Sequence, residues 1–66
     1  MNIDYDVFEV LPNRSLMLRV SIRGTQRALA VLKAVGSRTS NECFATEIET
    51  QEVIGRVNNG RGAARN

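Results

Sequence analysis

The chain contains no histidine and no tryptophan, and only one of its 66 residues is cysteine and one is proline. Catalytic acid–base and nucleophilic sites are most often built on histidine or on a residue that a neighbouring base activates. Without histidine, and without carboxylates paired at a useful spacing, we expect that the protein is not an enzyme. The lone Cys43 can neither close a disulfide within the chain nor assemble a Cys/His metal site, so we expect no metal and no cofactor.

Long apolar runs are also missing from the sequence. No stretch approaches the roughly 18 residues that a membrane-spanning helix needs. The N-terminal segment Met1–Asp6 is acidic, whereas a secretory signal begins with basic residues and continues with apolar ones. We therefore expect a cytoplasmic protein that does not enter the membrane.

The net charge of +2 comes entirely from the end of the chain. Residues 1–57 carry seven basic and seven acidic side chains, so Arg61 and Arg65 supply the whole excess. The segment 58–66 is rich in Asn, Gly and Arg and has no large apolar side chain to bury. We predict one small domain over residues 1–57, followed by a disordered tail over residues 58–66.

The first third of the domain has the pattern of a β-hairpin. Residues 3–11 and 16–23 are rich in β-branched, aromatic and aliphatic side chains, and the second run alternates between apolar and mostly polar positions. Between them, Pro12 and Asn13 are the residue types that favour a type I turn. Two antiparallel strands are therefore predicted here.

The middle of the chain has helical periodicity. After Gly24, with Thr25 as a candidate N-cap, apolar residues recur at positions i, i+3, i+4 and i+7, and Gly36 follows as a terminator. This spacing predicts an amphipathic helix, whose apolar face consists of Ala28, Val31, Leu32 and Val35.

The last third is harder to interpret, because Thr39–Glu42 matches a capping box and could begin a second helix. At about 100° per residue, however, Phe44 and Ile48 would lie on the side of such a helix opposite to Val53 and the apolar residues that follow it. Alternation along two runs separated by a polar turn fits the pattern better. We predict a second hairpin, with a short helix over residues 50–57 as the alternative.

The resulting order ββαββ predicts an α+β fold, in which a four-stranded antiparallel sheet has the one helix packed on one face. The first hairpin allows two registers. One pairs Val7 with Val20, and the other pairs Val10 with Leu16. We favour the first, because it buries no aspartate. On the face without the helix it places the candidate interface residues Phe8, Val10, Met17, Arg19 and Arg23.

Either register leaves two or three large apolar side chains on this open face, which is more than scattered surface residues explain. We therefore expect a protein-interaction module that forms a homodimer through the open face or by pairing edge strands. A different protein or a small ligand is the alternative cover. The alternative function is weak nucleic-acid binding by Arg19, Arg23 and the C-terminal tail, although the neutral body and the nearby aspartates argue against it.

Two segments of the chain carry a resemblance, Arg38–Ala45 and Glu52–Asn58. Together with the Leu-Pro-Asx turn and the central helix, they resemble a loose group of short bacterial proteins of unknown function that have a Thr-x-Asn-Glu-x-Phe stretch before a final hairpin. The resemblance covers most of residues 5–58. It implies no activity, cofactor or site; it implies that the chain is complete and that the tail after residue 58 is its variable part.

Overall fold

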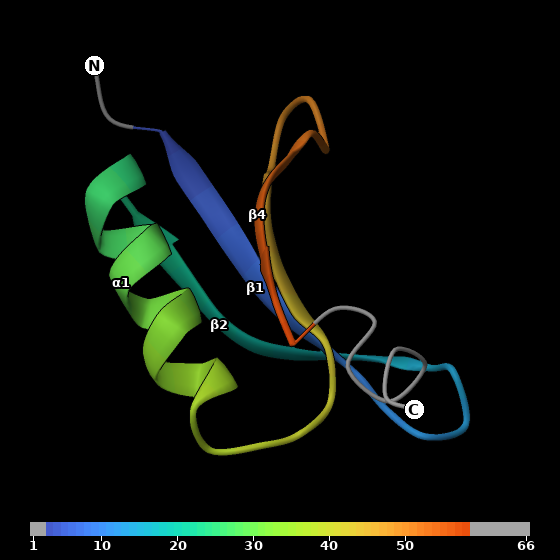
Figure 1. Cartoon of the computed structure of the whole chain (residues 1–66). Coiled ribbons are helices and arrows are strands. Elements are labelled where there is room, and N and C mark those ends of the chain that lie inside the picture. Colours follow the sequence, from blue (N-terminus) through green and yellow to red (C-terminus); the bar gives the residue numbers. More distant parts are fainter. Residues whose placement is uncertain (1–2, 59–66) are drawn as a thin grey trace.

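The structure is a computed structural model in which residues 3–58 are described. The element order confirms the predicted ββαββ arrangement, including the second hairpin (Figure 1). The elements are β1 (Asp4–Val10), β2 (Leu16–Arg23), α1 (Thr25–Gly36), β3 (Cys43–Glu47) and β4 (Val53–Val57).

The four strands form one antiparallel sheet in the order β2-β1-β3-β4, so that β1 and β3 are central and β2 and β4 are the two edges. Helix α1 lies across one side of this sheet (Figure 1). The α+β architecture with one helix on one face is therefore confirmed. Within residues 3–58, no helix has the length and the apolar character needed to cross a membrane.

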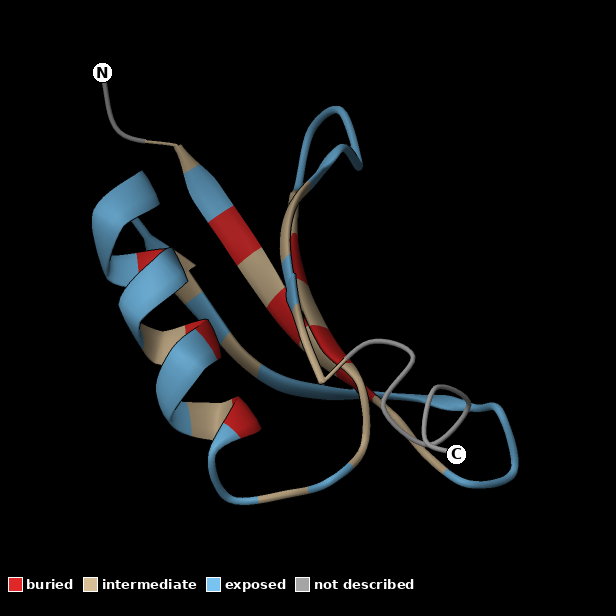
Figure 2. Ribbon diagram, viewed as in Figure 1, coloured by how far each residue is buried: buried red, intermediate tan, exposed pale blue. Residues whose placement is uncertain are grey.

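The core lies between α1 and the two central strands. Val7, Leu32, Cys43 and Ala45 are buried there, and the red segments in Figure 2 mark this layer. Small residues let the helix approach closely, because a Cβ on Gly55 would lie only 3.1 Å from Leu29 Cδ2. The sheet residues beneath this part of the helix are therefore small, and two of the three aromatic residues, Phe8 and Phe44, lie on the other face, whereas Tyr5 is buried on the helix side.

The start of the helix differs from the prediction. Gly24, at φ 97°, precedes the first turn, and no side chain among residues 3–58 caps it. Thr25 is instead the first helical residue, and its hydroxyl is hydrogen-bonded to the Tyr5 hydroxyl at 2.7 Å. Glycine readily adopts the positive φ at position 24, so Gly24 takes the N-cap position. The Thr25 side chain therefore does not cap the helix and instead links it to β1 through Tyr5.

Both predicted registers of the first hairpin occur, one in each half. Val7 pairs with Val20, as in the favoured register, but Val10 pairs with Leu16, as in the alternative. The two halves are joined by a β-bulge in which Arg19 has no partner on β1. The one extra residue reverses the faces of the β2 side chains between the bulge and the turn.

The fold extends one residue beyond the predicted domain boundary. Asn58, which the prediction assigned to the tail, is half-buried at the end of β4. Its Nδ2 donates to the carbonyl oxygens of Gly36, Thr39 and Asn41 at 2.9, 2.9 and 3.0 Å. This side chain therefore joins the end of α1 to the loop before β3. The rest of the predicted tail, from residue 59 on, lies outside the described residues.

We predict that Gly36→Ala destabilises the fold by about 1–3 kcal/mol, the usual cost of overpacking. A Cβ at this position would collide with Cγ2 of Val57, although alanine is the better helix former by up to about 1 kcal/mol. Urea unfolding followed by circular dichroism measures the change. Ala34→Gly, at an exposed position of the same helix, is the control and should cost only the propensity difference. A Gly36→Ala protein as stable as the wild type would contradict this packing.

Candidate functional site

The face of the sheet turned away from α1 has two aromatic rings near its middle. Phe8 and Phe44 are paired across β1 and β3, and their ring centroids are 5.5 Å apart with an interplanar angle of 32°. Each alternates with buried residues that face the helix, so each projects to the opposite side. The two rings form the apolar centre of this open face.

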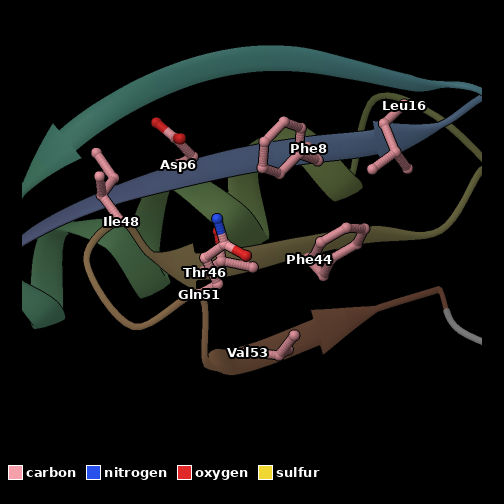
Figure 3. A pocket seen from close by; sticks show the side chains of 8 residues that line it. All are labelled: Asp6, Phe8, Leu16, Phe44, Thr46, Ile48, Gln51 and Val53. Carbon is pink, nitrogen blue, oxygen red and sulfur yellow. The ribbon is translucent and has the colours of Figure 1, made fainter.

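A groove of about 440 Å³ runs over the rings along the strand direction (Figure 3). Leu16 lies at one end of the groove and Ile48 at the other, with Gln51 beside Thr46 between them. The complete lining is Asp6, Phe8, Leu16, Phe44, Thr46, Ile48, Gln51 and Val53.

The rim of this groove is apolar and open to solvent. Leu16 and Leu18 are 55% and 53% exposed, and Ile48 is 42% exposed. Leu18 is paired with Phe8 and therefore lies on the same face. Six large apolar side chains are exposed among residues 3–58, and four of them belong to this face: Leu16, Leu18, Ile48 and Val53.

Charged groups on the open face are already paired within the molecule. Arg23 Nε lies 3.0 Å from Asp4 Oδ1. Asp6 accepts a hydrogen bond of 2.6 Å from the Ser21 hydroxyl. The guanidinium of Arg56 contacts Glu42 at 2.8 Å and lies 5.7 Å from the centroid of the Phe44 ring. The face therefore combines an apolar centre with two ion pairs and with Asp6, whose carboxylate is hydrogen-bonded to Ser21.

The structure separates the five residues predicted for the interface. Phe8, Val10 and Arg23 lie on the open face, where Phe8 is opposite Phe44. Met17 and Arg19 do not join them, and their predicted placement is corrected. Met17 is paired with Glu9 on β1, and Glu9 is paired on its other side with the buried Cys43. Because Cys43 faces the helix and paired residues lie on the same face, Met17 also faces the helix side of the sheet.

Arg19, the extra residue of the bulge, forms an ion pair with the buried carboxylate of Glu9 on the helix side of the sheet. Arg19 Nη1 donates to Glu9 Oε1 at 2.8 Å, while Thr39 Oγ1 and Asn41 Nδ2 both donate to Glu9 Oε2 at 2.8 Å. Glu9 is only 5% exposed, and a carboxylate removed from water needs such partners. These four side chains, Glu9, Arg19, Thr39 and Asn41, are called the Glu9 cluster.

Hydrogen bonds lower the pKa of Glu9. Donation from Asn41 and Thr39, together with the charge of Arg19, holds the pKa of Glu9 below its ordinary value, against the opposing effect of burial. Burial, followed by the charge of Glu9, raises the pKa of the neighbouring Cys43 thiol. A fully buried thiol with a raised pKa is neutral and poorly nucleophilic, which agrees with a structural role for Cys43.

Sequence reasoning missed the side chains that contribute most apolar surface to the open face: Leu16, Leu18, Phe44, Ile48 and Val53. The first two were expected under the helix, because the alternation of residues 16–23 shows no interruption where the bulge occurs. The sequence held one usable signal for the Glu9 cluster. A glutamate on the buried side of a strand needs polar partners, and the Thr39–Glu42 stretch offers polar side chains. Within residues 3–58, no three cysteine or acidic side chains come close enough together to hold a metal ion.

No family model, no curated protein and no solved structure matches this chain significantly. The resemblance to short bacterial proteins therefore remains a prediction. The structure nevertheless gives its polar stretch a physical role, since Thr39 and Asn41 hold the carboxylate of Glu9.

We predict that the stability of the fold depends on the ionisation of Glu9. Because its pKa is lowered by folding, the carboxylate stabilises the fold above the ordinary glutamate pKa of about 4.3, and this contribution is lost as the pH falls through the lowered value. Urea midpoints measured from pH 6 to pH 3 should fall for the wild type and change less for Glu9→Gln. Glu49→Gln, in an exposed turn, is the control and should follow the wild type. Parallel curves for wild type and Glu9→Gln would refute this role.

Proposed function

We propose that the protein is a non-enzymatic interaction module of a bacterial, cytoplasmic type, whose open face binds a second copy of the chain. The observation that carries this proposal is the groove over Phe8 and Phe44 with its exposed apolar rim. A contiguous apolar surface of this kind is typical of an interface rather than of a free surface.

The pairing of charges favours a second copy as the partner. The two ion pairs of the open face, Asp4–Arg23 and Glu42–Arg56, leave no strong field to attract a highly charged ligand. The matching partner is therefore apolar at its centre, where it lies against Phe8 and Phe44. The open face itself has this composition, and a two-fold axis brings one such patch onto another.

The edges of the sheet favour stacking of faces over pairing of edge strands. Each edge strand holds an unpaired extra residue, Arg19 in β2 and Ile54 in β4. Bulges of this kind interrupt the row of free backbone groups that a further strand would need. Face-to-face stacking needs no such row.

The geometry gives little support to the alternative of nucleic-acid binding. Arg19 and Arg23 were its proposed contacts within the domain, and they lie on opposite faces of the sheet. Each is paired with a carboxylate at 2.8 and 3.0 Å. A phosphate would have to displace these partners at both positions.

We predict that Leu18→Lys raises the dissociation constant of the dimer at least about tenfold, because it removes a leucine from two symmetric contacts and adds two charges. Molar mass measured by light scattering over a hundredfold dilution reports the change. The wild type should keep a mass near twice 7.3 kDa further down the dilution series than the variant does.

Met17→Lys is the matched control for this experiment. Met17 is the neighbouring residue on the same strand and is 41% exposed, but it lies on the helix side of the sheet. Its substitution should leave the mass unchanged. A wild-type protein that is monomeric throughout would refute self-association, and equal effects of the two variants would refute the assignment to the open face.

A further inference from the structure

The two ends of the open face differ in charge. The β1–β2 turn and the β3–β4 turn lie at opposite ends of the sheet (Figure 1). The β1–β2 turn presents the exposed Arg14, which has no carboxylate partner among residues 3–58. The β3–β4 turn at the other end presents the exposed Glu49 and Glu52, and neither has an ion pair within the described part of the chain; Glu47, paired with the buried Tyr5, lies on the helix side.

The groove has the same polarity along its length. Leu16 and Ile48 lie at opposite ends of the groove (Figure 3). Leu16 follows the turn that carries Arg14, and Ile48 precedes Glu49 in the β3–β4 turn. The Leu16 and Ile48 side chains are each about half exposed, and the groove between them is open to an incoming side chain. A copy turned end for end would place the Leu16 of each chain over the Ile48 of the other.

We propose that two copies stack with their two-fold axis across the groove, so that the Arg14 end of each copy lies over the acidic turn of its partner. This inference rests on the proposed self-association and specifies its orientation. Shape and charge support it independently, because exchange of the ends both seats Leu16 beside Ile48 and brings Arg14 near Glu49 and Glu52. An axis along the groove would instead bring the two acidic turns together, and their repulsion would oppose association.

Charge exchange tests the orientation. Arg14→Glu should weaken the dimer on the order of tenfold, because two exposed attractive contacts become repulsive. Adding Glu49→Arg and Glu52→Arg to the same chain should restore the affinity. Lys33→Glu, on the exposed side of α1, makes the same change in net charge and should have no effect. The wild-type affinity should also fall as salt is raised.

Disulfide trapping tests the same orientation without relying on charge. Leu16→Cys and Ile48→Cys proteins, mixed and oxidised with oxidised glutathione, should form a covalent dimer that neither forms alone. The wild type is the blank, since its Cys43 is fully buried.

The outcomes separate the two proposals. A wild-type dimer without rescue by charge exchange and without the mixed disulfide would overturn the orientation and leave self-association standing. A wild type that is monomeric at every concentration would overturn both. Rescue together with the mixed disulfide is the result that the structure leads us to expect.

Discussion

A single twelve-residue helix can cover only one face of a four-stranded sheet, and the arrangement of the molecule follows from this limit. The helix sits close to the sheet because β3 and β4 place Cys43, Ala45 and Gly55 beneath it. The rings of Phe8 and Phe44 lie in contact on the opposite side, whereas Tyr5 is buried on the helix side next to Thr25. The protein thus buries a small apolar core on one face of the sheet and leaves apolar side chains exposed on the other. These exposed side chains are the physical basis of the proposed self-association.

The β-bulge at Arg19 connects the buried side of the sheet to the exposed one. On the helix side, Arg19 meets the carboxylate of Glu9, which also holds the loop before β3 through Thr39 and Asn41. On the other side, the same extra residue turns Leu18 toward Phe8 and away from the helix. Satisfying a buried carboxylate and assembling the open face are therefore two consequences of one irregularity in β2.

The sequence was sufficient for the order of the elements, because alternation and helical periodicity are local properties. It also predicted correctly that the open face would keep large apolar side chains, since that follows from having one helix. It could not place Met17 and Arg19, because a bulge depends on contacts between strands that the alternation along one strand does not reveal, here Arg19 with Glu9. The order β2-β1-β3-β4 was equally inaccessible, since the pairing of β1 with β3 spans the whole helix and has no local signature.

The most direct test of self-association through the open face is a series of two-dimensional NMR spectra of the backbone amides over a hundredfold dilution. The account predicts that the amide shifts of Phe8, Leu18, Phe44 and Ile48 change with concentration, whereas those of Ala30 and Lys33 on the exposed side of α1 stay constant. Shifts that do not depend on concentration, or that change on the helix and not on the open face, would contradict it.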